Sequence, residues 1–237
     1  MENHLERGSS NPMKIALIGY GKMGKLIEQK ALEKGHAIIA VMDSKNPVNL
    51  PASKQALSQA DVVIDFSTPD SVMSNLRTVA DLKKNLVMGT TGWTDKLGEA
   101  ERLVNASGIG FLHSPNFSLG VALFFKLIDK AASLMEPFDQ YDAAGIEIHH
   151  KNKLDSPSGT AKLLSARINS HRKHPITFSS VRVGSVPGTH TVVFDSPVDS
   201  ITLTHTAYNR EGFAGGALHA AEWLQGKQGI FTLDDLL

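Results

Sequence analysis

The chain has 237 residues, 41% hydrophobic and 20% charged, a composition typical of a globular protein of one or two domains. Its 24 basic and 24 acidic residues cancel, so its overall charge favours neither nucleic acid nor an anionic membrane, and any anion must bind through a local cluster. The absence of cysteine excludes disulfides, thiolate metal sites and cysteine nucleophiles, and is compatible with the cytoplasm. The apolar runs are short and interrupted, so we expect no membrane span.

The polar segment 1–12 lacks the apolar core of a secretory signal, and we expect it to be a disordered leader. From residue 13 onwards, short apolar runs predict buried strands at 13–18, 37–42, 62–66, 86–88 and 109–112. Helices are predicted between them at 22–34, 69–82 and 95–105, and a proline-broken loop at 46–53. This alternation predicts an α/β fold with a Rossmann-type, doubly wound parallel sheet.

The pattern changes after a helix predicted at 119–135. Segments rich in Val, Thr and Ile predict strands at 145–150, 176–186, 189–194 and 200–207, with helices at 158–169 and 212–224. Turns such as Val-Pro-Gly separate these strands. We therefore expect a smaller α+β domain with a mixed or antiparallel sheet.

Residues 19–24 form a GxGxxG motif between a predicted strand and a predicted helix, the context in which this motif is informative. Gly19 permits the tight turn, Gly21 lets a pyrophosphate approach the backbone, and Gly24 allows close helix–strand packing. The helix N-terminus offers unpaired N–H groups to the phosphates. We predict dinucleotide contacts from Gly19, Tyr20, Gly21, Lys22, Met23 and Gly24.

Asp43 ends the second strand, about 20 residues further on, where an acid accepts hydrogen bonds from the ribose hydroxyls and favours NAD over NADP. Lys45 partly offsets the repulsion of a 2′-phosphate, and Asp43 has the alternative interpretation of a turn former. Two later loops follow predicted strands, where such sheets bind ligands, although as isolated strings they are only turns. The cofactor residues predicted there are Gly89, Thr90, Thr91, Ser114, Pro115, Asn116 and Phe117.

The segment 147–161 reads EIHHKNKLDSPSGTA and brings two histidines and two lysines together beyond a predicted strand. Ser156 and Pro157 are predicted as N-cap and N1 of a helix, so that the N–H groups of residues 158–160 face outward and bind a carboxylate. Lys153 and His150 add charge for a second carboxylate, and His149 is a candidate proton donor. The alternatives are a solvated basic surface and a metal site, although two adjacent histidines without a carboxylate make a poor one.

This segment resembles the signature E-x-H-H-x-x-K-x-D-[AS]-P-S-G-T-A of the dihydrodipicolinate reductases. Four further strings resemble the family in the same order: GYGKMG at 19–24, GTTGW at 89–93, SPNFSLGV at 114–121 and HTAYNREGFAGGA at 205–217. The resemblance covers residues 13–237. It implies a Rossmann domain at 13–118 and 210–237, and a substrate-binding and oligomerisation domain at 119–209 that builds a homotetramer.

The resemblance further implies reduction of dihydrodipicolinate to tetrahydrodipicolinate by NADH or NADPH, in lysine and diaminopimelate biosynthesis. It assigns proton transfer to His149 and Lys153, and substrate contacts to His150, Lys153, Gly159 and Thr160. It places Arg210 near the substrate. The chain departs from the family by being short between Val41 and Asp61, and by having Ser44 where some members have arginine.

Two other functions stay open. One is a different Rossmann-fold dehydrogenase of an amino acid or dicarboxylate, such as an aspartate dehydrogenase, which would lack the HHxxKxDxPSGT string. The other is a nucleotide-sensing regulator on the same fold, which would bind NADH without turnover.

Overall fold

The computed structural model describes residues 11–237, so most of the predicted leader at 1–12 lies outside the described residues. The chain divides into two compact units. Unit 1 consists of the described part of Met1–Ser118 together with Phe213–Leu237, and unit 2 is Leu119–Gly212. Within residues 11–237, none of the helices combines the length and the hydropathy needed to cross a bilayer.

Unit 1 contains a six-stranded sheet in the order β10-β5-β4-β3-β1-β2, in which all paired neighbours are parallel. The strands are nearly continuous apolar runs, which is the pattern of a sheet covered on both faces. The strands are β1 (Lys14–Ile18), β2 (Ala37–Met42), β3 (Val62–Asp65), β4 (Asn85–Met88), β5 (Gly110–His113) and β10 (Gly229–Phe231).

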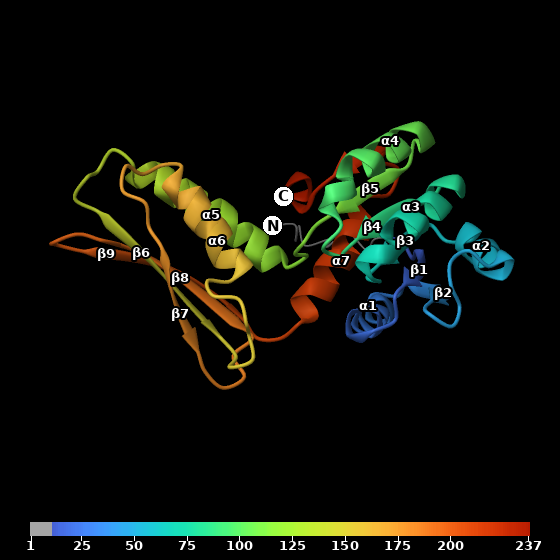
Figure 1. Ribbon diagram of the computed structural model, residues 1–237, viewed down its shortest axis with the longest axis horizontal. Helices are drawn as coiled ribbons and strands as arrows, with labels where there is room; N and C mark the ends of the chain where they lie inside the picture. The colour runs from blue at the N-terminus through green and yellow to red at the C-terminus, as the bar shows by residue number, and fades with distance from the viewer. Residues whose placement is uncertain (1–10) are drawn as a thin grey trace, which may run out of the picture. The chain divides into compact units, whose positions relative to one another are not determined.

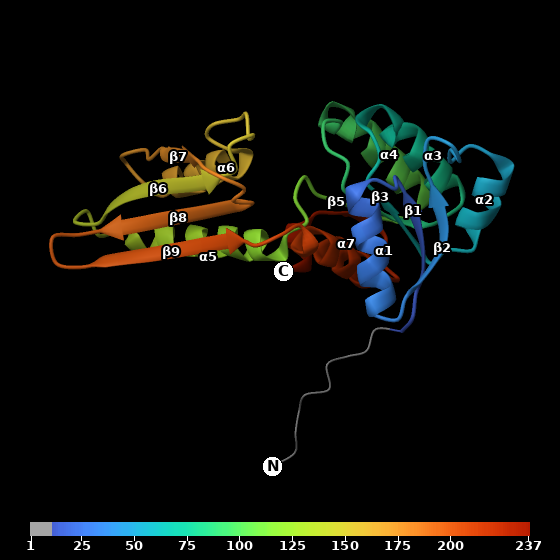
Figure 2. The same cartoon turned by 90° about the horizontal axis from the view of Figure 1, so that it is seen from below.

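Helices cover both faces of this sheet. The helices are α1 (Lys22–Glu33), α2 (Pro51–Ser58), α3 (Val72–Asp81), α4 (Leu97–Ser107) and α7 (Glu211–Trp223), and the short 3-10 turns are η1 (Pro69–Ser71), η2 (Thr94–Lys96) and η3 (Leu233–Leu236). Buried side chains of α2, α3 and α4 form one apolar core with the sheet, and Figure 2 shows α1 and α7 on the opposite face. The predicted doubly wound α/β architecture is confirmed.

One prediction in unit 1 is wrong. The segment 46–53 was expected to be a loop, but Pro51 is the first residue of α2. A proline is tolerated there because the first helical N–H has no partner within the helix. The helix is stabilised by Leu57, which is fully buried in the core and lies beyond the proline-rich stretch.

Unit 2 contains a four-stranded mixed sheet in the order β7-β6-β8-β9. Its strands are β6 (Asp142–His149), β7 (Phe178–Arg182), β8 (Gly188–Asp195) and β9 (Ser200–Ala207). Strands β6 and β7 are parallel, whereas the β6–β8 and β8–β9 pairs are antiparallel. Helices α5 (Leu119–Met135) and α6 (Gly159–Asn169) pack together on one face of this sheet (Figure 1).

The turn after β1 generates a stability prediction. Gly19 has φ +87°, and a Cβ there would lie 2.3 Å from the Phe66 carbonyl oxygen. Gly35 has a similar φ of +82° but no atom within 4 Å of its Cβ position. We expect Gly35→Ala to cost about 1 kcal/mol of backbone strain, and Gly19→Ala roughly 2–5 kcal/mol because overpacking adds to that strain. Urea unfolding followed by the fluorescence of the two tryptophans, both in unit 1, measures the difference; equal costs would contradict this account.

Candidate functional site

The glycine-rich loop of unit 1 follows β1, at the point where the strand order reverses between β1 and β3. A Cβ on Gly19 would clash with the Phe66 carbonyl oxygen, and a Cβ on Gly24 would lie 2.3 Å from the Gly19 carbonyl oxygen. Gly21 has no atom within 4 Å of its Cβ position and precedes α1 as its N-cap without a side chain. Gly19 and Gly24 therefore close the loop, and Gly21 leaves the helix N-terminus open to an anion.

Two cavities of about 740 and 430 Å³ run along this edge of the sheet. Residues 19–21 and Asp43 help to line the larger cavity, and residues 21–23 and 89–91 help to line the smaller one. Because both include Gly21, the cavities adjoin there and together make a groove that extends from the end of β2 to the end of β4. A groove that passes a helix N-terminus at the switch point of a parallel sheet fits an extended dinucleotide.

Asp43 lines the groove and also shapes its own turn. Its Oδ1 accepts hydrogen bonds from the backbone N–H groups of Lys45 (2.9 Å) and Asn46 (3.0 Å). Asp43 therefore does form a turn, through Oδ1. Its side chain is exposed in the wall of the cavity. Contact with a ribose stays a prediction.

The loop 114–117 has a different arrangement. The Ser114 hydroxyl donates to the Asn116 carbonyl oxygen (2.7 Å), and the Phe117 ring is 1% exposed and packs against Phe66 with centroids 5.8 Å apart. None of the residues 114–117 is among those lining the two cavities. Their contribution to cofactor binding stays a prediction.

Sequence reasoning missed one buried acid beneath the groove. Asp65 ends β3 and accepts hydrogen bonds from the Ser67 N–H (2.8 Å), the Asn75 amide (2.9 Å) and the Thr90 hydroxyl (3.3 Å). Burial raises the pKa of Asp65, and these hydrogen bonds oppose that rise. A charged residue ending an otherwise apolar strand is the sequence signal that marks it. Asp65 ties together the loops after β3 and β4.

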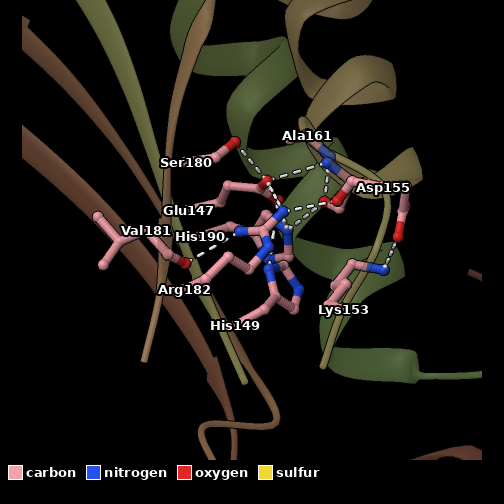
Figure 3. Close-up of polar contacts among 10 residues, drawn as sticks. Glu147, His149, Lys153, Asp155, Ala161, Ser180, Val181, Arg182 and His190 are labelled. Atoms are coloured by element: carbon pink, nitrogen blue, oxygen red, sulfur yellow. Dashed lines mark hydrogen bonds and ion pairs between the residues drawn. The ribbon is translucent and has the colours of Figure 1, made fainter. Parts of the chain in front are cut away.

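In unit 2, polar side chains gather around Glu147 on the helix-bearing face of the sheet (Figure 3). Glu147 is fully buried and pairs across strands with Ser180 of β7 and His190 of β8. Its Oε1 accepts hydrogen bonds from the Ser158 N–H (2.9 Å), the Ser180 hydroxyl (2.7 Å) and the Arg182 guanidinium (2.9 Å). Desolvation favours the neutral acid, but these hydrogen bonds outweigh it and lower the pKa of Glu147 to about 2.

The second oxygen of Glu147 faces His149, two residues along β6. The His149 Nδ1 lies 3.3 Å from Glu147 Oε2, which is an ion-pair distance, but neither atom has a hydrogen-bond partner in the described chain. The imidazole stands edge-on to His190, with centroids 5.1 Å apart. Burial lowers the pKa of His149; the Glu147 carboxylate opposes this, and the Lys153 ammonium adds to it. His149 and Lys153 are thus close enough to interact electrostatically.

The N-terminus of α6 differs from the prediction. Ser156 and Pro157, joined by a cis peptide bond, are not its N-cap and N1 residues. Ser158 is the N-cap, with its Oγ accepting the Ala161 N–H (3.2 Å). Ser158 is selected because it is buried and its hydroxyl also bonds to the His190 Nε2 (3.2 Å), a tertiary contact that local sequence does not reveal.

The predicted anion-binding amides are therefore fewer than expected. The Ser158 N–H is occupied by Glu147, whereas Gly159 is exposed and Thr160 partly exposed at the start of α6. The Lys153 Nζ lies 2.7 Å from Asp155 Oδ1, and this contact, with help from the Gly159 N–H, lowers the pKa of Asp155. An internal carboxylate thus lies against groups predicted to hold a substrate carboxylate.

His149 and His150 are adjacent in the sequence but lie in different surroundings. His150 follows the end of β6 and is partly exposed, and the buried neighbour of His149 is His190. Glu147, His149 and His190 bring three potential ligand atoms within 4.8 Å of one another. The Arg182 guanidinium already supplies positive charge at Glu147, which argues against a second cation.

Several cluster residues were missing from the sequence analysis. Only Glu147 carried a signal, as an acid within an apolar strand. Arg210, expected near the substrate, is exposed just before α7 and is not part of the Glu147 cluster. The members that sequence reasoning missed are Glu147, Ser180, Arg182 and His190.

The cluster predicts a loss of stability in acid. Burial, above all, lowers the pKa of His190 from 6.5 to about 4, so the unfolded chain binds more protons between these pH values and unit 2 loses roughly 3 kcal/mol as the pH falls through them. Glu147 stays ionised to about pH 2 when folded, so a second loss follows below pH 4.5. Hydrogen exchange of β6 and β8 amides measures both stages.

His190→Gln should reduce the first stage, to which His149 also contributes because its pKa is lowered by burial, and should leave the second. His174→Gln, at an exposed histidine, is the matched control and should leave both. An unchanged stability slope between pH 6.5 and 4 in His190→Gln would contradict the assignment.

Comparison with known proteins agrees with this geometry. The family model for the dihydrodipicolinate reductase N-terminus matches residues 13–117, and that for the C-terminus matches residues 120–237. A 4-hydroxy-tetrahydrodipicolinate reductase of Christiangramia forsetii is 40% identical over 95% of this chain and 98% of its own length. One of Archaeoglobus fulgidus is 36% identical over 95% and 100%.

A solved structure is similar over the same extent. The dipicolinate-bound dihydrodipicolinate reductase of Paenisporosarcina sp. TG-14 superposes with a TM-score of 0.81 at 25% identity, covering 95% of this chain and all of its own. Both halves of the sequence and the fold of the whole chain thus agree. The chain belongs to the dihydrodipicolinate reductase family and is an oxidoreductase.

Proposed function

We propose that this enzyme reduces 4-hydroxy-tetrahydrodipicolinate to tetrahydrodipicolinate with NADH or NADPH, in the cytoplasm, for lysine and diaminopimelate biosynthesis. The observation that carries the proposal is the cluster in unit 2. There Glu147 contacts both His149 and the Ser158 N–H, and Asp155 contacts both Lys153 and the Gly159 N–H at the start of α6. In a chain with no net charge, this local cluster suits a small dianion. The names of the two curated relatives support the same substrate.

One substrate carboxylate binds the Lys153 ammonium and the amides of Gly159 and Thr160, and His150 contacts the second. The Lys153 ammonium is paired with the Asp155 carboxylate in the structure, so the substrate carboxylate replaces an internal ion pair. Such an exchange conserves charge pairing and favours a ligand with a carboxylate at this position. The dipicolinate bound to the Paenisporosarcina relative is a dicarboxylate of this kind.

The groove of unit 1 fits a nicotinamide dinucleotide, which supplies the hydride when bound. The open N-terminus of α1 at Gly21 suits the pyrophosphate, and residues 89–91 suit the nicotinamide end. Asp43 accepts hydrogen bonds from the ribose hydroxyls. It favours NADH because its carboxylate repels a 2′-phosphate, and only Lys45 would offset that repulsion.

Reduction adds a hydride to carbon and a proton to the atom that receives the displaced electron pair, and the 4-hydroxyl group of the substrate leaves as water. His149 supplies or relays that proton, with Lys153 as the second donor. Lys153 and the α6 amides hold the carboxylates and so fix the orientation of the ring. The protein's part in the reaction is thus binding, orientation and proton transfer.

The sheet of unit 2 supports the proposed homotetramer. Its helix-free face carries Ile146 (40% exposed) and Val181 (43% exposed), and two threonine pairs joining β8 and β9, Thr189–Thr206 and Thr191–Thr204. A partly apolar sheet face of this kind suits burial against another subunit. Light scattering should give a mass about four times 25.6 kDa, and a monomer would contradict the proposal.

A coupled assay tests the function. With substrate generated by the preceding synthase, the enzyme should oxidise NADH, with a higher kcat/KM than for NADPH. His149→Gln and Lys153→Ala should each lower kcat by about two orders of magnitude, the typical contribution of a positioned proton donor.

Lys151→Ala and His174→Gln are matched controls at exposed positions and should retain the activity. Pyridine-2,6-dicarboxylate should compete with the substrate and bind more weakly to Lys153→Ala. Wild-type turnover in both active-site variants would remove the assignment of His149 and Lys153.

A further inference from the structure

We propose that Glu147 is the positioning residue of the reaction: one carboxylate orients the His149 imidazole through Oε2 and fixes the start of α6 through Oε1. The inference rests on the proposed function and adds to it a residue to which neither the family resemblance nor the comparisons assign a role.

The contacts divide cleanly between the two oxygens. Oε1 is saturated by the Ser158 N–H, the Ser180 hydroxyl and the Arg182 guanidinium, at 2.7–2.9 Å. Oε2 has His149 Nδ1 at 3.3 Å and, farther away, His190 Nε2 at 3.6 Å. The contact is not aligned as a hydrogen bond, but the lone pair of a bare Nδ1 would be repelled by the buried Oε2, so the carboxylate favours the tautomer with the proton on Nδ1.

This arrangement decides which nitrogen of His149 works. With the proton on Nδ1, Nε2 is the nitrogen that gains and loses the catalytic proton. A Cβ on Gly188 would lie 3.0 Å from Nε2, so the glycine that opens β8 leaves room beside this atom. Glu147 also stabilises the imidazolium against burial, as a carboxylate does when it orients a general acid–base histidine.

The other charged and titratable groups facing His149 leave this role to Glu147. Lys153 and Arg182 disfavour the imidazolium, and Asp155, which favours it, is held by Lys153. The remaining neighbour is His190, whose own buried ring resists protonation. Glu147 is therefore the acid that keeps His149 protonatable.

The same carboxylate links the proton donor to the anion site. Ser158 is the residue before Gly159 and Thr160, whose amides are proposed to bind a substrate carboxylate, and its own N–H is bound by Glu147. The proton donor and the helix end that receives a substrate carboxylate thus share one buried anchor.

The test is the pH dependence of kcat for Glu147→Gln, Glu147→Asp and Ser180→Ala. The alkaline limb is the fall of kcat at high pH, where His149 loses its proton. Removing the charge of Glu147 should move this limb down by about one pH unit or more, and kcat at neutral pH should fall about tenfold. Glu147→Asp keeps the charge but withdraws it, so its limb should lie between those of the wild type and Glu147→Gln. Ser180→Ala, the matched control, loses only an Oε1 donor and should keep the wild-type limb.

A role limited to folding predicts lower stability with an unmoved limb in all three variants, and that result would overturn the inference. If Glu147→Gln does not fold, the comparison of Glu147→Asp with Ser180→Ala decides in the same way. Failure of the proposed function is distinguishable, because the wild-type enzyme would then show neither turnover nor binding of pyridine-2,6-dicarboxylate.

Discussion

The carboxylate of Glu147 is the interaction on which unit 2 depends. It is a fully buried anion, held by a backbone N–H, a hydroxyl and a guanidinium. These donors come from β7 and from the start of α6, and its cross-strand partner His190 comes from β8. A buried charge is tolerated only when it is paired and hydrogen-bonded, so this carboxylate constrains the strand register and the helix position together.

The backbone prepares the candidate site in unit 1, whereas side chains prepare it in unit 2. In unit 1 the backbone prepares the binding surface, since glycines close the loop after β1 and Asp65 fastens the adjacent loops beneath the groove. In unit 2 side chains prepare the chemistry, since a buried acid orients a histidine and a lysine is paired with an internal carboxylate. A dinucleotide needs a long surface rich in N–H groups, whereas proton transfer needs one side chain in one orientation.

The parts of the structure that could be predicted are those that depend on residues close together in the sequence. We could predict the apolar strands that alternate with helices, the GxGxxG loop and the long helix α5, because the signal for each lies within a few neighbouring residues. Helix α2 was missed because a buried leucine, not local propensity, holds a proline-initiated helix in place. The Glu147 cluster was missed because Ser180, Arg182 and His190 join it through strand register, 33 to 43 residues away in sequence. The N-cap of α6 was misplaced for the same reason, since tertiary contacts select Ser158.

The protonation state of the His149 imidazole tests the proposed role of Glu147 most directly. Nitrogen-15 NMR of histidine-labelled, ligand-free enzyme, with the His149 signals assigned by their loss in His149→Gln, reports which ring nitrogen carries the proton. We expect a neutral ring near pH 7.5 with the proton on Nδ1 and a bare Nε2 that takes up the second proton as the pH falls. A ring protonated on Nε2 with a bare Nδ1 would contradict it.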